Sequence, residues 1–348
     1  MYTQEIINDF IIRIPKAELH MHLEGSIEPK MMFKLAERNK IKLRWESPEA
    51  LREAYHFNNL QSFLDLLFEG CNVLRTEQDF YDVTEAYLNR VKLDGVRHAE
   101  AFIGPQSFLQ NGVPIDVVMN GVIQALKDAE KTTGITTGFL ISAHRHRTEA
   151  AAFELLELIM PWRDQLVGLG MGGAEVGNPP SKFQQYFKEC HARGFNLTIH
   201  AGEEGPTEYV REAINLLGVD RIDHGNTAMR DPELLQQLSD KQIALTMCPV
   251  SNLLLNVITD LSEHPLRIML QKNIPVTINS DDPSYFNAYV AENWIQSQMK
   301  LSLTFEEMIQ LAKNSFQGSF LPLPRKAQYI TEIENFCLDF FRRDIRAN

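Results

Sequence analysis

Residues 196–248 read NLTIHAGEEGPTEYVREAINLLGVDRIDHGNTAMRDPELLQQLSDKQIALTMC, and this stretch decides the fold. Its short apolar runs predict three strands, at Asn196–His200, Arg221–His224 and Ile243–Cys248. The segments between them, Glu208–Leu217 and Pro232–Ser239, are long enough for helices. Strands that alternate with helices indicate βα units and a parallel sheet.

The same alternation continues on both sides of this stretch. It predicts five further strands, at Ala17–Leu23, Val96–Ile103, Thr136–Ser142, Leu166–Gly172 and Pro275–Asn279, and further helices at Lys182–Arg193 and Pro265–Gln271. Eight strands are the number that closes a (β/α)₈ barrel, and 348 residues fit one such barrel with insertions. We therefore expect a single α/β domain, 1–348, with the TIM-barrel fold. A doubly wound open sheet is the alternative.

The connection after the first predicted strand is unusually long, because it runs from Glu24 to Gly95. Within it, residues 31–40, 60–74 and 77–93 carry apolar side chains at helical spacing. We expect a helical insertion over the mouth of the barrel, and extra C-terminal helices from Ala291 onward.

The chain carries 34 basic and 46 acidic residues, a net charge of −12. This balance argues against a partner such as nucleic acid or an anionic membrane, but it does not exclude a small base or nucleoside as substrate. No run approaches the ~18 apolar residues of a membrane span, and the N-terminus does not resemble a signal peptide. The four cysteines have no C-x-x-C spacing, so we expect reduced thiols and a cytoplasmic protein. Homo-oligomerisation stays open.

Histidines and carboxylates collect at the ends of four predicted strands. These ends read His20-Met21-His22, His200-Ala201-Gly202-Glu203, Asp223-His224-Gly225 and Ser280-Asp281-Asp282-Pro283. In a barrel of this kind the chemistry lies at the C-terminal ends of the strands. His20 and His22 face the same way, because side chains two positions apart on a strand share a side. If the barrel closes, the first and eighth strands are neighbours and these side chains converge on one mouth.

Three imidazoles and one carboxylate match a divalent metal ion such as Zn²⁺, with a water in the open position. The predicted ligands of this ion, one per chain, are His20, His22, His200 and Asp281. Such an ion lowers the pKa of bound water to about 7. Glu203 lies just beyond a predicted ligand, so it is placed to carry the proton that this water releases.

Each motif also has a purely structural interpretation. A lone H-x-H on a strand is often incidental, Asp281-Asp282-Pro283 resembles a helix N-cap, and His224 alone fits a core histidine. The four motifs together favour the metal site, because their joint occurrence at strand ends is much rarer by chance. Of the remaining histidines, His144 and His146 stay undecided, and the others are interpreted as structural: His56, His98, His191 and His264.

Five motifs occur in a recognisable order: PKAELHMHLEGS at 15–26, HAGEE at 200–204, RIDHG at 221–225, CPVSN at 248–252 and NSDDP at 279–283. Together they resemble the adenosine/adenine deaminase family of the amidohydrolase superfamily, over residues 14–320. The resemblance implies a zinc-dependent (β/α)₈ barrel that acts on a small purine.

By position, the resemblance implies the same four metal ligands. It makes Glu203 the proton shuttle that protonates a purine ring nitrogen as hydroxide attacks C6. It makes His224 the residue that orients or deprotonates the metal-bound water, and Asp282 the hydrogen-bond partner of N7. The expected products are a 6-oxopurine and ammonia, or an amine if N6 carries a substituent.

Two positions resemble the adenine deaminase branch, whose substrate is the free base. Adenosine deaminases typically have Asp where this chain has Glu24, and Gly where it has Asp223. Glu24 is expected to fill the space of a ribose and to contact the base edge. Besides Asp282, the residues expected at the substrate are Glu24, Gly172 and Glu175, the last of which opens the phrase EVGNPPSKF.

The chain departs from this branch at Gly104, Gly172 and Gly173, near which acidic or hydroxyl residues are usual. These glycines either allow tight turns or widen the pocket enough to admit N6-substituted, cytokinin-like adenines. We expect adenine as the substrate, with an N6-substituted adenine or adenosine as alternatives. A metal-dependent amide or phosphoester hydrolase is the alternative from another enzyme class, and an inactive binding barrel is the non-enzymatic one.

Overall fold

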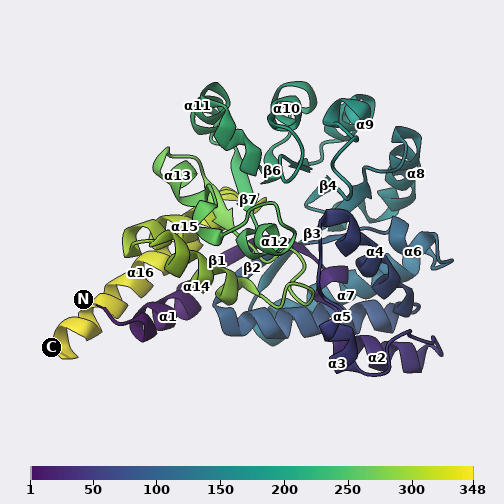
Figure 1. Cartoon of the computed structure of the whole chain (residues 1–348), viewed down its shortest axis with the longest axis horizontal. Helices are drawn as coiled ribbons and strands as arrows, with labels where there is room; N and C mark the ends of the chain where they lie inside the picture. Colours follow the sequence, from purple (N-terminus) through teal and green to yellow (C-terminus); the bar gives the residue numbers. More distant parts are fainter. Residues whose placement is uncertain (1, 348) are drawn as a thin grey trace.

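Eight parallel strands form the centre of the protein in a computed structural model that describes residues 2–347 (Figure 1). The strands are β1 Lys16–His22, β2 Val96–Ile103, β3 Thr136–His144, β4 Gly168–Gly172, β5 Thr198–Ala201, β6 Arg221–His224, β7 Ala244–Met247 and β8 Val276–Ile278. Hydrogen bonding orders them as two four-stranded sheets, β1-β2-β3-β4 and β5-β6-β7-β8, and every pair is parallel.

Two isolated bridges join these sheets into a closed barrel. Met21 in β1 bridges to Asp281 beyond β8, and Leu169 in β4 bridges to Leu197 ahead of β5. The predicted (β/α)₈ barrel is therefore confirmed, and the doubly wound open sheet is wrong. The run Gly168–Gly173 has the spacing G-x-G-x-x-G, but most of it forms β4 itself rather than the strand-to-helix turn of a dinucleotide site.

Helices surround the strands (Figure 1). They are α1 Gln4–Arg13, α2 Pro29–Arg38, α3 Pro48–Glu53, α4 Leu60–Gly70, α5 Glu77–Val91, α6 Gln106–Leu109, α7 Ile115–Thr133, α8 Glu149–Ile159, α9 Gln184–Ala192, α10 Thr207–Glu212, α11 Pro232–Lys241, α12 Pro249–Leu254, α13 Leu266–Gln271, α14 Val290–Leu301, α15 Phe305–Gln317 and α16 Leu323–Ala347. Two predicted helices are divided: a 3₁₀ turn at Pro180–Phe183 precedes α9, and a π-helical turn at Ala213–Leu217 follows α10.

The long connection between β1 and β2 has two roles in the fold. The helix α4 carries apolar side chains at helical spacing, and this face lies over the mouth of the barrel: Leu60, Phe63, Leu64, Leu67 and Phe68. Asn59 caps the first turn of α4, because its side chain accepts a hydrogen bond from the Ser62 N–H. The helix α5 instead packs against α7 in the outer ring. Only part of this connection is therefore the expected insertion over the mouth.

The expected C-terminal helices are also present. The helix α15 packs against β1 and β8, and α16 packs against α15. Phe336 and Phe340 of α16 contact Phe10 of α1, with ring centroids 5.5 and 5.1 Å away. The two ends of the chain therefore lie side by side (Figure 1).

Charged side chains lie inside the barrel, where branched apolar residues are usual. Arg221 in β6 donates from Nη1 to Glu100 Oε2 in β2 over 2.5 Å, and both side chains are fully buried. Burial alone would raise the pKa of Glu100, but Arg221 and His98 hold it at about 2. This ion pair joins β2 and β6 across the barrel interior.

Two further expectations concern thiols and membrane spans. The four cysteines are free, as expected for reduced thiols: Cys71, Cys190 and Cys248 are buried and Cys337 is partly buried. Between residues 2 and 347, no helix is both long enough and apolar enough to cross a membrane.

Replacing Arg221 with Met should lower the free energy of unfolding by about 3–5 kcal/mol at pH 7, because Glu100 is then a buried charge without its cation. Urea unfolding measures this loss. In the wild-type protein the pair is fully stabilising above about pH 4.5, the ordinary pKa of glutamate, and the stabilisation is lost as the pH falls towards 2. Arg193→Met, which breaks a surface ion pair with Glu157, should cost less than about 1 kcal/mol. Equal losses of unfolding free energy in Arg221→Met and Arg193→Met would contradict a stabilising buried ion pair between Arg221 and Glu100.

Candidate metal centre and active site

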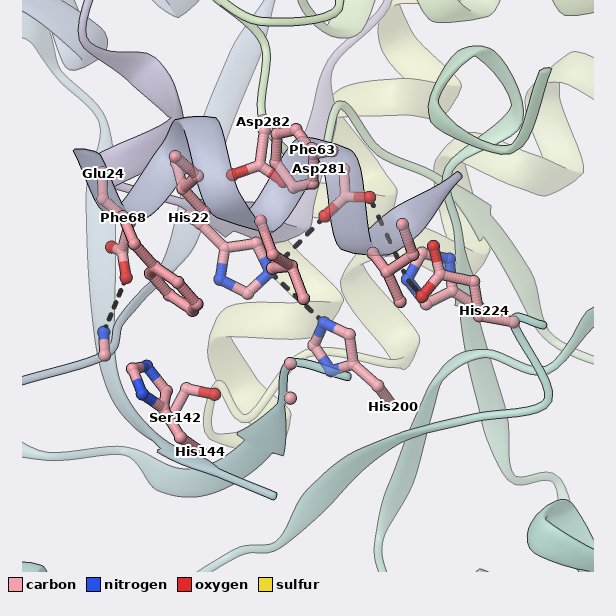
Figure 2. Close-up of a pocket in the computed structure, with 17 residues that line it drawn as sticks. His22, Glu24, Phe63, Phe68, Ser142, His144, His200, His224, Asp281 and Asp282 are labelled. Carbon is pink, nitrogen blue, oxygen red and sulfur yellow. Dashed lines mark hydrogen bonds and ion pairs between the residues drawn. The ribbon is translucent and has the colours of Figure 1, made fainter. Parts of the chain in front are cut away.

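The structure brings the four predicted metal ligands together at the C-terminal ends of the strands. His20 and His22 end β1, His200 lies in β5, and Asp281 follows β8. The Nε2 atoms of His20 and His22 lie 3.1 and 3.2 Å from His200 Nε2. Asp281 Oδ1 lies 3.4 Å from each of the Nε2 atoms of His20 and His22. Figure 2 shows His22, His200 and Asp281 pointing toward one another.

These spacings fit a bound metal ion. Ligand atoms that lie 2.0–2.1 Å from a tetrahedral centre are about 3.3 Å from one another. Imidazole nitrogens and a carboxylate oxygen, without any thiolate, form a donor set typical of Zn²⁺ and similar divalent ions. The cluster can therefore hold one such ion.

Neighbouring groups orient the histidines of the cluster. His20 Nδ1 lies 3.0 Å from Thr246 O, so it carries the proton and leaves Nε2 free to bind a metal. Asp223 Oδ2 lies 3.2 Å from His200 Nδ1 and has the same effect. Burial lowers the pKa of His200 to about 4, which keeps its imidazole neutral at pH 7. Asp223 was one of the two positions that resemble the adenine deaminase branch. In the structure it contacts the side of the His200 ring that faces away from the cluster.

Asp281 is held in an uncommon backbone conformation. Its φ of +64° lies in the left-handed region, which residues other than glycine seldom adopt. Ser251 Oγ in α12 donates to Asp281 Oδ2 over 2.7 Å, which leaves Oδ1 toward the imidazoles. Burial alone would raise the pKa of Asp281, but His20 and His22 hold it well below its ordinary value, so the carboxylate is ionised.

Glu203 and His224 lie beside this cluster. Glu203 Oε2 is 3.5 Å from His224 Nε2, which is itself 3.9 Å from Asp281 Oδ2. Burial raises the pKa of Glu203 well above its ordinary value, and the charge of Asp281 adds to the effect, so the site favours the protonated carboxyl. Burial lowers the pKa of His224 well below its ordinary value, so its imidazole is neutral.

Asn252 determines which nitrogen of His224 carries the proton. Its Oδ1 accepts from Asn226 Nδ2 over 2.8 Å and lies 3.1 Å from His264 Nε2. Its Nδ2 therefore points at His224 Nδ1, 3.4 Å away. A donor in this position leaves the proton of His224 on Nε2, the nitrogen that faces Glu203. Asn252 has no role among the sequence-based expectations, although it lies in the motif CPVSN.

A pocket lies between this cluster and the apolar face of α4 (Figure 2). Its polar wall away from His224 is formed by Glu24, Ser142 and His144. Glu24 Oε1 accepts from the Gly104 N–H over 2.9 Å, whereas its Oε2 has no hydrogen-bond partner among the described residues. Burial raises the pKa of Glu24.

Two more side chains line the same pocket. His144, which the sequence left undecided, is neutral because burial lowers its pKa to about 3. Asp282 lies next to Asp281, and its Oδ1 has no partner in the part of the chain that is described. Burial raises the pKa of Asp282 well above its ordinary value, and the charge of Asp281 adds to the effect.

The three glycines of the pocket do not leave open space. A Cβ atom on Gly104 would lie 2.5 Å from His144 Nε2, and one on Gly172 would lie 3.2 Å from the His200 ring. Gly173 has a φ of +91°, which favours glycine whatever the space. These positions therefore allow close packing and a tight turn, and they do not support a pocket widened for N6-substituted adenines.

Glu175, which we expected at the substrate, is not among the residues that line this pocket. Its carboxylate accepts hydrogen bonds from the backbone N–H groups of Gly202, Glu204 and Gly205. The sequence did not indicate this position, because the partners are amides of a loop 27 to 30 residues further along the chain.

The fold and the cluster define a class of proteins, the hydrolases with a metal-binding cluster at the C-terminal ends of a (β/α)₈ barrel. The chain belongs to the adenosine deaminase family, whose model matches residues 15–336, and it is a hydrolytic deaminase. The resemblance inferred from the five motifs is confirmed. This membership argues against an amide or phosphoester hydrolase and against an inactive binding barrel.

Several relatives are similar over most of their length. A protein named adenine deaminase from Rhodopseudomonas palustris is 51% identical over 95% of this chain and 96% of its own. One of the same name from Pseudomonas putida (strain W619) is 49% identical over 89% of this chain and 98% of its own.

Two solved structures are also similar. The adenine deaminase of Arthrobacter aurescens has a TM-score of 0.91 and 43% identity, and the match covers 93% of this chain and 99% of that one. An amidohydrolase from Burkholderia ambifaria, with bound zinc, has a TM-score of 0.89 and 25% identity. The match covers 98% of this chain and 96% of that one.

We expect one divalent transition metal per chain to copurify with the protein. His20→Ala and Asp281→Ala should each lower the metal content at least tenfold, because each removes one of four ligand atoms. Elemental analysis by mass spectrometry measures this content. His56→Ala, at an exposed histidine, should leave it unchanged. Full metal content in both cluster variants would show that the ion binds elsewhere.

Proposed function

We propose that the chain hydrolyses the exocyclic amine of adenine to give hypoxanthine and ammonia, with one Zn²⁺ per chain. The observation that carries the proposal is that His22, His200 and Asp281 of the cluster line one pocket together with Glu203 and His224. Similarity to relatives named adenine deaminase, which reaches 51% identity over 95% of this chain, supports adenine as the base.

The four ligands of the ion are proposed to be His20, His22, His200 and Asp281. When bound, Zn²⁺ lowers the pKa of a coordinated water to about 7 and so supplies a nucleophile at neutral pH. The zinc in the Burkholderia ambifaria amidohydrolase supports zinc over other divalent ions.

Glu203 provides the proton that the aromatic ring needs. Addition of water at C6 moves electrons into the ring, and the ring accepts them readily only if N1 becomes protonated. The Glu203 carboxyl lies at the wall of the pocket, and burial raises its pKa, which favours the form that can donate a proton, so we assign it this transfer. The carboxylate that remains takes the proton of the hydroxyl group newly bonded to C6 and passes it to N6, so that the C6–N6 bond breaks, ammonia departs and C6 keeps a carbonyl oxygen. The next water molecule to enter the site returns a proton to Glu203.

His224 acts as a hydrogen-bond donor in this scheme. The contact with Asn252 leaves the proton of His224 on Nε2, so this nitrogen is not free to accept a proton from the attacking water. Between the two roles that the family resemblance left open, we therefore favour orientation of the water and stabilisation of its charge.

The base is proposed to lie under the apolar face of α4. Asp282 would contact the N7 edge, and Glu24 would contact the opposite edge through its unpartnered Oε2. A free adenine carries an N9–H that such an acceptor can bind, whereas a nucleoside carries a sugar at N9 instead. We therefore propose the free base as substrate, and adenine rather than an N6-substituted adenine, because the pocket glycines are packed against other side chains.

Glu203→Gln should lower kcat by at least ~10² to 10⁴ with the metal content unchanged, because it removes the proton donor and leaves the ligands in place. Steady-state assays of adenine together with metal analysis measure both quantities. Glu208→Gln, at an exposed position on α10, is the matched control and should keep kcat within about threefold. Near wild-type kcat in Glu203→Gln would show that another group moves the proton.

The ratio of kcat/KM for adenine over adenosine should be at least ~10³, because a sugar leaves several hydroxyls unpaired and collides with Glu24. Glu24→Asp should lower this ratio by at least tenfold, because the shorter side chain frees space at N9. Assays of adenine, adenosine and N6-methyladenine on both proteins measure the preference. Comparable turnover of adenosine by the wild-type protein would refute the free-base assignment.

A further inference from the structure

Glu175 is a buried carboxylate directly under the loop that carries Glu203. It follows β4, and its side chain is fully buried. Its Oε1 accepts from the Gly202 N–H over 2.6 Å. Its Oε2 accepts from the N–H groups of Glu204 and Gly205 over 2.9 and 2.8 Å.

The glycines of this loop allow it to close around the carboxylate. Gly202 has a φ of +73°, a conformation that other residues rarely adopt. A Cβ atom on Gly205 would lie 2.6 Å from the carboxylate carbon of Glu175 and 2.7 Å from its Oε1. Backbone N–H groups that converge in this way form a binding site for an anion, and here the anion is a side chain of the same protein. Glu175 thus explains the glycine at position 205, whereas the positive φ explains the one at position 202.

A second buried side chain, that of Arg145, binds the backbone just before this loop. Arg145, which follows β3, donates from Nη1 to His200 O and from Nε to Asn178 O, the latter over 3.0 Å. Asn178 Nδ2 in turn donates to Ala174 O over 3.1 Å, next to Glu175. Buried side chains therefore join the loops after β3 and β4 to the end of β5.

We propose that Glu175 is a positioning residue, which fixes the backbone on both sides of Glu203 and so aims its carboxyl at the ring nitrogen of the substrate. The amide that precedes Glu203 and the amide that follows it are both hydrogen-bonded to this one carboxylate. The direction of the Glu203 side chain therefore depends on the Glu175 carboxylate, although Glu175 does not line the pocket. This inference rests on the proposed role of Glu203 as the proton donor.

A double-mutant cycle tests the inference, because two residues that act as a unit have non-additive effects. Glu175→Gln keeps the size of the side chain but turns an NH₂ group toward one backbone N–H. In the otherwise wild-type enzyme it should lower kcat for adenine 10- to 100-fold, with KM within threefold and the metal content unchanged. In the Glu203→Gln background the same substitution should change kcat less than threefold. Glu208→Gln should leave kcat for adenine within threefold in both backgrounds.

Three results would overturn the inference: equal losses of kcat in the two backgrounds, a kcat within threefold of wild type in Glu175→Gln, or a loss of metal. If Glu175→Gln does not fold, Gly205→Ala replaces it, because the added methyl group displaces the same carboxylate. The same background dependence is then expected, and equal losses again overturn the inference. Wild-type kcat in Glu203→Gln alone would instead refute the proposed role of Glu203 as the proton donor, and the inference with it.

Discussion

Asp281 exchanges two backbone hydrogen bonds with β1: its N–H donates to His20 O over 3.1 Å, and its carbonyl accepts from the His22 N–H over 2.8 Å. These bonds join the last strand to the first, so the barrel closes at the residue that also contributes the carboxylate of the cluster. The positive φ of Asp281 is held by this pairing and by the bond from Ser251. One residue therefore both closes the barrel between its last and first strands and contributes the carboxylate of the cluster.

A second constraint follows from placing so many ionisable groups out of water. An isolated buried charge is strongly unfavourable, so each one needs a partner. Asp223 is paired with His200 and accepts from Thr198 Oγ1 and Thr246 Oγ1 over 2.8 and 2.9 Å. Glu100 has Arg221 in the same way. Inside the barrel, these buried carboxylates are thus compensated by neighbouring hydrogen-bond donors and cations. The cluster lies at the C-terminal ends of the same strands.

The sequence predicted those features that depend on local pattern. Strands were located because apolar runs alternate with helical segments, and β6 coincides with the predicted Arg221–His224. The cluster residues were found because each ends a strand, and strand ends meet at one face of a barrel. The local pattern also indicated the apolar face of α4, as a helix in the insertion after β1.

Other features depend on how distant loops pack, and no local signal revealed them. His144 was ambiguous because nothing near it in sequence shows that Glu24 and Gly104 lie beside it. Glu175 was predicted to contact the substrate, but its partners are backbone N–H groups. Every residue except proline has such a group, so no residue type in the sequence indicates these contacts. The pocket glycines had two interpretations until the side chains that occupy their space were known.

The roof of the pocket and its chemical centre are encoded in separate segments of the chain. The residues of α4 that face the pocket are all apolar, and none of them contributes to the cluster. Their replacement can reshape the space above the base without disturbing the groups that carry out hydrolysis. A barrel organised in this way can change the shape of the space above the base through one helical insertion, while the polar groups at the strand ends keep their places.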